Sequence, residues 1–202
     1  MDIAKTSSVL FSIGHSNHSI EQFLDLLGRH GIETVADVRS SPFSRYNPQF
    51  SQPVFERSLQ EQGIDYVFLG VELGARRHEA ECYLDGKVVY DQVPRTEAFQ
   101  RGMARLVDMA SRSRTAMLCA EKDPLTCHRT ILIARHIKEL VGDVLHILTD
   151  GALETQSEAE QRLLVECNLQ EQNLFLTRQQ RLDDAYQKRA AHIAYEEPAP
   201  YA

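Results

Sequence analysis

The chain has 202 residues, of which 43% are hydrophobic and 25% are charged, and its formal net charge is −7. These values are typical of a globular protein with a full hydrophobic core, and the negative charge excludes a general nucleic-acid or membrane binder that works by electrostatics alone. The four cysteines are too few for a disulfide framework, and no apolar run is long enough for a signal peptide or a membrane span. We therefore expect a cytoplasmic protein with reduced thiols and no membrane contact.

Short apolar segments separated by turn residues predict strands that alternate with helices in the first seventy residues. Ser19 is a good N-cap for the first helix, and Gly31 is a good stop for it. The pattern predicts strands over residues 9–14, 32–38 and 64–69, and helices over residues 20–30 and 53–62.

A long segment with little periodicity, residues 70–94, follows the third predicted strand. Asp85 and Gly86 predict a tight turn within it. A loop of this length in a compact domain is usually functional or mobile. Beyond it the pattern predicts helices over residues 96–112 and 130–137, strands over 115–120 and 143–148, and a tail of helical character over 157–194.

Alternating strands and helices are typical of βα units and a parallel sheet. The sequence therefore predicts an α/β fold in which a mostly parallel sheet has helices on both faces, a Rossmann-like three-layer arrangement. We expect residues 1–150 to form this domain and to carry the site, and residues 151–202 to form a helical C-terminal extension with a frayed end. Residues that can do chemistry follow the strand ends, where such folds bind ligands: His15, Ser16, Asp37, Arg39, Glu72, Cys119, Glu121 and Asp150.

The junction between the strand over 115–120 and the next helix is the most informative part of the chain, because it holds two thiols, a carboxylate, an imidazole and a guanidinium. Thr126 or Asp123 can cap the helix, which would place Cys127, His128 and Arg129 in its first turn. The partial positive charge of a helix start disfavours cations such as Arg129 and a protonated His128. An anion bound there would offset this repulsion. The alternative is two buried cysteines and a surface arginine.

Two chemistries fit the thiols. In the first, the helix start and nearby cations lower the pKa of Cys127, which is the nucleophile; Cys119 is its partner, and Glu121 or His15 is the general acid or base. In the second, Cys119, Cys127, His128 and His15 could supply the sulfur and nitrogen ligands of zinc or another transition metal, with Cys119, Cys127 and His128 as the candidates and Glu121 as a base beside a metal-bound water. The residues alone do not decide between these two chemistries.

A third interpretation concerns the arginines, which come from loops at the same predicted edge. Arg39 and Arg129 would form an anion clamp, and aromatic and amide side chains nearby suit a planar base. Pairing of Arg39 with Asp37 is an equally good prediction. The candidate substrate-binding residues are Arg39, Arg129, His128, Arg45 and Arg76.

Five short segments form a distinctive combination. They are Ser-Ile-Gly-His-Ser at 12–16, Asp-Val-Arg-Ser-Ser-Pro-Phe-Ser-Arg at 37–45, Leu-Gly-Ala-Arg at 73–76, Cys-Ala-Glu-Lys at 119–122 and Cys-His-Arg at 127–129. Together they resemble the family catalogued as domain of unknown function 488, in its long form with a helical C-terminal extension. The resemblance implies an α/β domain and marks these positions as the family's signature, but it brings no established reaction. Ala75 stands where the family usually has a second glycine.

A possible partner motif lies in the tail, where residues 171–175 read Glu-Gln-Asn-Leu-Phe. This segment is similar to the peptide by which bacterial DNA-replication and repair proteins hold the sliding clamp, with Glu171 in place of the leading glutamine. Leu174 and Phe175 would fill an apolar pocket on the partner. The alternative is that both side chains pack onto the domain.

Taken together, the residues predict an enzyme that uses thiol or thiol–metal chemistry on a phosphorylated, nucleotide-like or nucleic-acid substrate. Its partner would be an anionic small molecule or a nucleic-acid end. The competing prediction is a non-catalytic nucleotide or nucleic-acid binding module of the DNA replication or repair machinery, in which the cysteines are structural. The sequence assigns no cofactor beyond the candidate metal ligands.

Overall fold

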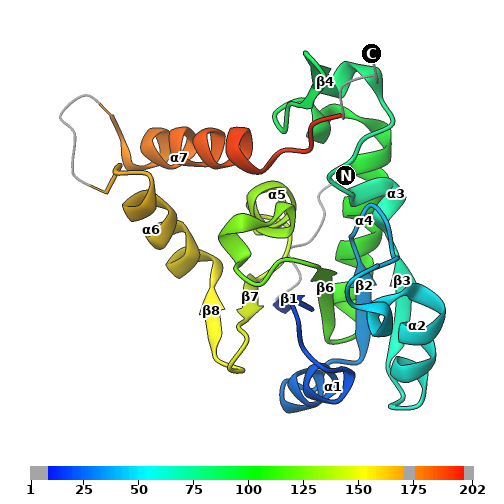
Figure 1. Ribbon diagram of the computed structural model, residues 1–202. Coiled ribbons are helices and arrows are strands. Elements are labelled where there is room, and N and C mark those ends of the chain that lie inside the picture. Colours follow the sequence, from blue (N-terminus) through cyan, green and yellow to red (C-terminus); the bar gives the residue numbers. More distant parts are fainter. Residues whose placement is uncertain (1–8, 171–175, 198–202) are drawn as a thin grey trace.

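The computed structural model describes residues 9–170 and 176–197 (Figure 1). Within these residues the fold is built on a six-stranded sheet in the order β3-β2-β6-β1-β7-β8. Neighbouring strands are parallel except β8, which runs antiparallel to β7 at one edge, and a separate hairpin pairs β4 with β5. The strands are β1 (Val9–Gly14), β2 (Thr34–Asp37), β3 (Asp65–Phe68), β4 (Tyr83–Leu84), β5 (Lys87–Val88), β6 (Thr115–Cys119), β7 (Asp143–Ile147) and β8 (Leu153–Thr155).

Helices and short helical turns connect the strands and follow the sheet. The α-helices are α1 (Ile20–Arg29), α2 (Gln52–Gln60), α3 (Gly70–Leu73), α4 (Glu97–Arg112), α5 (Arg135–Ile137), α6 (Gln156–Glu166) and α7 (Arg178–Ile193). A π-helix, η5 (Arg129–Ala134), leads directly into α5. The 3-10 turns are η1 (Pro48–Phe50), η2 (Ala80–Cys82), η3 (Val93–Arg95) and η4 (Pro124–Thr126).

Each face of the sheet is covered by helices, so the molecule has two hydrophobic cores (Figure 1). Side chains alternate along a strand, and in β1 Phe11 and Ile13 face one core while Leu10 faces the other. The first core packs against α1 and α2; the second packs against α4, η5, α6 and α7. The prediction of a mostly parallel α/β sheet with helices on both faces is confirmed.

Local signals explain several boundaries. The Ser19 side chain accepts a hydrogen bond from the backbone N–H of Gln22, whose own side chain accepts from the backbone of Ser19, so α1 begins with a capping box. Asp85 and Gly86 have φ values of 50° and 77°, the left-handed conformations that a tight turn between two antiparallel strands requires. The turn predicted at Asp85 and Gly86 is therefore present, as the tip of the β4–β5 hairpin.

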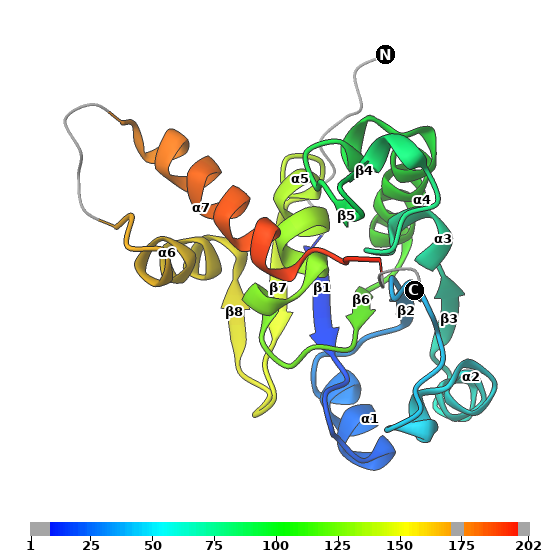
Figure 2. The same cartoon turned by 45° about the horizontal axis from the view of Figure 1, so that its top comes forward.

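The C-terminal part of the chain is integrated into the fold. Strand β8 adds an edge to the sheet, so the sheet continues past residue 150, where we expected the α/β domain to end. Helices α6 and α7 contribute Leu163 and Tyr186 to the same core as η5. The segment after α7 then crosses to the β4–β5 hairpin, where the N–H of Val88 donates to the carbonyl oxygen of Tyr195 at 2.9 Å (Figure 2).

A chain of buried polar side chains joins the sheet to these C-terminal helices. Ser12 Oγ lies 2.6 Å from His146 Nδ1, and His146 Nε2 lies 2.8 Å from Gln156 Oε1. Gln156 donates to the hydroxyl of Tyr186 at 2.7 Å, and that hydroxyl donates to Glu160 at 2.9 Å. These buried side chains are thus linked by hydrogen bonds, as burial of polar groups requires, and the network holds α6 and α7 in one position on β1 and β7.

No helix within residues 9–170 and 176–197 has the length and apolar character needed to cross a membrane. The segment similar to a clamp-binding peptide, residues 171–175, lies outside the described residues.

Candidate functional site

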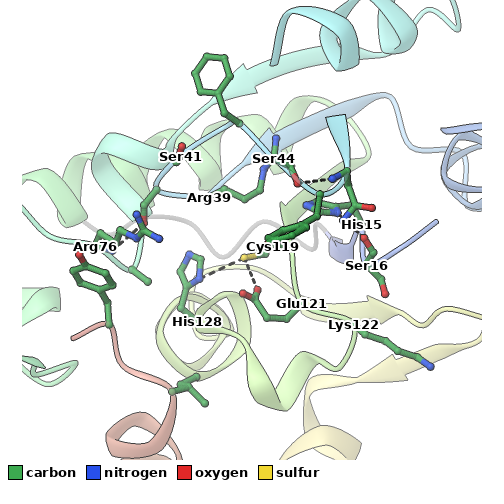
Figure 3. A pocket seen from close by; sticks show the side chains of 18 of the residues that line it. His15, Ser16, Arg39, Ser41, Ser44, Arg76, Cys119, Glu121, Lys122 and His128 are labelled. Carbon is green, nitrogen blue, oxygen red and sulfur yellow. Dashed lines mark hydrogen bonds between the residues drawn. The ribbon is translucent and has the colours of Figure 1, made fainter. Parts of the chain in front are cut away.

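A pocket of about 630 Å³ lies at the carboxyl ends of β1, β2 and β6 (Figure 3). Parallel strands bring these ends to one edge of the sheet, which is where α/β folds bind ligands. The loops after the three strands supply most of the wall, and the loop after α3 and the segment after α7 complete it. The residues on which the discussion of this pocket depends are His15, Arg39, Ser40, Ser41, Phe43, Tyr46, Arg76, Cys119, Glu121, Lys122, His128 and Tyr195.

Backbone hydrogen bonds carry the parallel pairing past the ends of the strands. The N–H of His15 donates to the carbonyl oxygen of Cys119, and the N–H of Ser16 donates to that of Ala120, each at 2.9 Å. The loops after β1 and β6 are thereby fixed to each other directly beneath the pocket.

Gly14 makes a close approach possible at the same place. A Cβ atom on Gly14 would lie 1.8 Å from the carbonyl oxygen of Glu121, far inside van der Waals contact. A side chain is therefore excluded there, because the turn after Cys119 passes directly over the end of β1.

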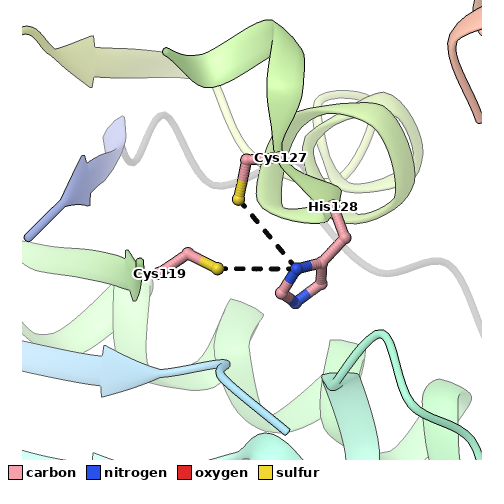
Figure 4. Close-up of side chains that lie close together, drawn as sticks. All are labelled: Cys119, Cys127 and His128. Atoms are coloured by element: carbon pink, nitrogen blue, oxygen red, sulfur yellow. Dashed lines mark hydrogen bonds between the residues drawn. The ribbon is translucent and has the colours of Figure 1, made fainter. Parts of the chain in front are cut away.

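Four side chains from the end of β6 and the segment after it form a cluster, which we call the thiol cluster: Cys119, Glu121, Cys127 and His128. Figure 3 shows Glu121 beside Cys119 and His128, and Figure 4 shows Cys119, Cys127 and His128. Both thiols contact the same oxygen of Glu121, with Sγ to Oε2 distances of 3.0 Å for Cys119 and 2.9 Å for Cys127. The two sulfur atoms also lie 3.5 Å and 4.0 Å from Nδ1 of His128. Two sulfurs, one ring nitrogen and one carboxylate thus face a common centre.

The orientation of His128 is set by the loop after β2. Its Nε2 lies 3.0 Å from the carbonyl oxygen of Val38, and a carbonyl can only accept, so Nε2 carries the hydrogen. The other ring nitrogen, Nδ1, faces the two sulfur atoms. The imidazole is therefore held with its lone-pair nitrogen toward the thiols whenever the ring is neutral.

The start of this helix is not capped as the sequence predicted. Asp123 does not cap it; its carboxylate accepts from the N–H of Leu125 and caps the preceding turn η4. Cys127 is extended, with φ −131° and ψ 141°, and its sulfur accepts from the backbone N–H of Arg129 at 3.5 Å. The cysteine thus stands at the cap of the helix rather than in its first turn.

Arg129 does not line the pocket, which corrects the prediction that it forms an anion clamp. The side chain is fully buried, and its terminal nitrogens donate to the carbonyl oxygens of Glu121 at 2.8 Å and Lys122 at 3.4 Å. Its Nε atom is buried without a hydrogen-bond partner. These two carbonyl oxygens balance the charge of the guanidinium at the helix start, where a cation is otherwise unfavourable. Arg129 therefore stabilises the turn that carries the cluster.

The cluster shifts the pKa values of its own groups. Burial raises the pKa of the Cys119 thiol well above its usual value, and the neighbouring charge on Cys127 adds to this effect. Burial acts in the same direction on Cys127, but the hydrogen bond from Cys119 and the charges of Arg129 and His128 outweigh it and hold the pKa of Cys127 well below the usual value. Partial withdrawal from water, together with Cys127, raises the pKa of Glu121.

The chain belongs to a known family. Residues 19–136 match the model of the family described as Domain of unknown function DUF488. This matched span is more than half of the chain and contains the whole thiol cluster. Neither the search of curated proteins nor the search of solved structures found a match.

The loop arginines of this DUF488 protein differ in burial and in hydrogen bonding. Arg39 is buried and its guanidinium holds both carboxylate oxygens of Asp37, while Nη1 donates to the carbonyl oxygen of Phe50 at 2.9 Å. The pairing alternative for Arg39 is therefore the one observed, although the residue still lines the pocket. Arg76 is exposed on the pocket wall, whereas Arg45 is exposed outside it.

Several lining residues were not among the sequence candidates. The pocket receives Lys122 from the turn after β6 and Tyr195 from the segment after α7. The guanidinium carbon of Arg76 lies 4.8 Å from the centre of the Tyr195 ring. Phe43 and Tyr46 are also on the wall and are 64% and 89% exposed, so their rings are free to meet a ligand. The sequence signal for this wall was the polar, aromatic loop after β2, but no local signal pointed to Tyr195.

The remaining candidates separate into two groups. His15 lines the pocket, with its ring stacked on Phe50 at 4.5 Å, and burial lowers its pKa to about 4, so the ring is neutral. Glu72 and Asp150 also follow strands, but both lie away from the pocket. Glu72 pairs with Arg105 of α4, and Asp150 accepts from the N–H of Ala152 in the β7–β8 turn.

Proposed function

We propose that this DUF488 protein is an enzyme that acts on a phosphorylated, nucleotide-like or nucleic-acid substrate through the thiol cluster. One observation carries the proposal: two thiols, a carboxylate and an imidazole meet at the base of a pocket whose rim has cationic, hydroxyl and aromatic side chains. Groups with strongly shifted pKa values gather at catalytic sites, because chemistry needs protonation states that water does not favour.

The rim supports the substrate class. Arg76 and Lys122 supply positive charge, and the hydroxyls of Ser40 and Ser41 supply hydrogen-bonding groups of the kind that phosphate oxygens bind. The exposed ring of Tyr46 offers a face for a planar base. A cavity of about 630 Å³ is of the size that holds a small-molecule ligand.

Within this proposal the cluster residues have different roles. Cys119 presents its sulfur to the pocket. Cys127, which the sequence predicted as the nucleophile or a ligand, is only 1% exposed, does not line the pocket and supports the centre from behind. Glu121 is exposed to the pocket and touches both sulfurs, which suits a general acid or base. All four cysteines are free, which is why we assign the enzyme to the cytoplasm.

Turnover of a panel of nucleoside phosphates and phosphorylated oligonucleotide ends tests the proposal. Wild-type protein should convert at least one member, and Cys119→Ser should lower that rate by about a hundredfold or more. The matched control is Cys82→Ser, which replaces another buried cysteine that does not line the pocket, and it should retain the rate. Binding of a panel member without turnover by wild-type protein would instead establish the non-catalytic binding module.

A further inference from the structure

The thiol cluster has the donor atoms and spacing of a metal site. Among the residues that the structure describes, Cys119, Cys127 and His128 form the group whose ligand atoms all lie within 4.8 Å of one another (Figure 4). Zinc binds sulfur at about 2.3 Å and imidazole nitrogen at about 2.0 Å, so tetrahedral angles separate sulfur from nitrogen by about 3.6 Å. The two sulfur-to-Nδ1 distances are 3.5 Å and 4.0 Å. A zinc ion therefore fits between these atoms with little movement.

The surroundings of the three donors match those of a metal centre. His128 donates through Nε2 to the carbonyl oxygen of Val38, and this second contact is the one that usually orients a metal-binding histidine and fixes its tautomer. The sulfur of Cys127 accepts from the backbone N–H of Arg129, a contact that stabilises a thiolate. These contacts hold Nδ1 of His128 and the sulfur of Cys127 in position at the common centre.

Charge gives an independent reason for a cation. Glu121 reaches both sulfur atoms, yet no lysine or arginine side chain within the described residues forms a hydrogen bond or ion pair with Glu121 or with either sulfur. Arg129 is the nearest candidate, but its guanidinium is used by the carbonyl oxygens of Glu121 and Lys122. A metal ion at the common centre would take the place of the proton on His128 as the positive charge beside Glu121 and Cys127.

We infer that Cys119, Cys127 and His128 bind a zinc ion, with Glu121 beside it as the group that takes a proton from a zinc-bound water. This inference deepens the proposed function, because it names the cofactor of the same cluster. Two sulfurs and one imidazole select zinc over magnesium or calcium, which prefer oxygen donors. Three protein ligands leave the fourth position open, as in catalytic zinc sites.

The geometry gives Glu121 the role of a base rather than a fourth ligand. Glu121 is exposed to the pocket, whereas the three ligands are buried. It contacts the sulfur atoms, but no hydrogen bond or ion pair joins it to His128 within the described part of the chain. The open zinc position would therefore face the pocket. Glu121 can accept a proton from the water bound there, and the oxygen of that water would then face the substrate.

The zinc content of the full-length protein, purified under reducing conditions, tests the inference without any substrate. We expect about one zinc ion per chain, and a loss of about tenfold or more in Cys119→Ser, Cys127→Ser and His128→Ala. Cys82→Ser and Cys167→Ser are matched controls that should keep the metal. Glu121→Gln should also keep it, and loss of zinc from that variant alone would make Glu121 a ligand and overturn its role as base.

A second measurement does not depend on how the variants fold. Cobalt exchanged into the wild-type protein should give the absorption of cobalt–thiolate bonds, and X-ray absorption of the zinc form should give sulfur at about 2.3 Å and nitrogen at about 2.0 Å. Wild-type protein that takes up no zinc when zinc is added, or a Cys119–Cys127 disulfide in the purified chain, would overturn the inference. Zinc binding without turnover of the substrate panel would retain the metal site and reject the proposed function.

Discussion

The guanidinium of Arg76 lies over the ring of Tyr195, with its central carbon 4.8 Å from the ring centre. This contact joins the loop after α3 to the segment after α7, and both residues are on the pocket wall. The site of this DUF488 protein is therefore assembled from parts of the chain that lie far apart in sequence.

The contact between Arg76 and Tyr195 should contribute measurably to stability. Replacement of the ring in Tyr195→Leu removes a cation–π interaction worth about 0.5–1 kcal/mol, so the free energy of unfolding should fall by about that amount. Tyr195→Phe keeps a ring and should be closer to wild type. Urea denaturation of both variants, and of each combined with Arg76→Met, measures the coupling; additive effects would contradict the interaction.

The buried side chain of His146 should make the free energy of unfolding depend on pH. Burial lowers its pKa from 6.5 to about 4, so between these pH values the unfolded chain binds a proton that the folded chain does not. Stability is therefore complete above pH 6.5 and falls with decreasing pH, by at most about 1.4 kcal/mol per pH unit from this group. In His146→Gln the fall between pH 6.5 and about 5 should be less steep than in the wild-type protein. Equal slopes in the two proteins would refute this assignment.

Gly14→Ala should be strongly destabilising. The added methyl group would meet the carbonyl oxygen of Glu121 at 1.8 Å, and neither backbone can move without breaking the pairing between β1 and β6. We expect a loss of about 1–3 kcal/mol or more in the free energy of unfolding. Gly28→Ala is the control, because nothing lies within 4 Å of its Cβ position in α1. That change should stabilise the protein by about 0.5–1 kcal/mol. A Gly14→Ala protein as stable as wild type would disprove the close approach.

Arg129 and Arg76 should respond differently to the same substitution. Arg129→Met leaves the carbonyl oxygen of Glu121 without its donor, which should cost about 1–3 kcal/mol of stability. Arg76→Met should cost less than about 1 kcal/mol, but it should weaken binding of the phosphorylated ligand found in the substrate panel. Denaturation and titration calorimetry on both variants separate the two roles. A stable Arg129→Met protein with weakened ligand binding would restore Arg129 as an anion clamp.

The sequence was sufficient for the features that depend on local pattern. Periodicity and turn residues predicted the five parallel strands of the sheet and the helices between them, but not the order of the strands. The rule that ligands bind at the carboxyl ends of parallel strands predicted the edge at which the chemistry-bearing residues meet. The grouping of Cys119, Glu121 and His128 near the pocket follows from that rule. What could not be predicted is the direction of each side chain: Cys127 and Arg129 flank His128 on the same segment, but both are buried and only His128 lines the pocket.

Other features depend on contacts between distant segments. Strand β8 has only three residues, Leu153–Thr155, and gains its structure from pairing with β7, so its own sequence gives little signal. The position of Tyr195 depends on a hydrogen bond to Val88 and on the ring contact with Arg76. No periodic pattern encodes such contacts, because they form only when both segments are already in place.

The segment after α7 crosses to the β4–β5 hairpin. This crossing determines the order in which the parts of the candidate site are completed during synthesis. All residues of the thiol cluster leave the ribosome well before Tyr195, whose carbonyl oxygen receives the N–H of Val88. The chain therefore completes the sequence of the thiol cluster before it completes the wall of the pocket. The wall that carries Tyr195 can form only after the segment after α7 has been made, so a ligand that needs this wall can bind only at the end of synthesis.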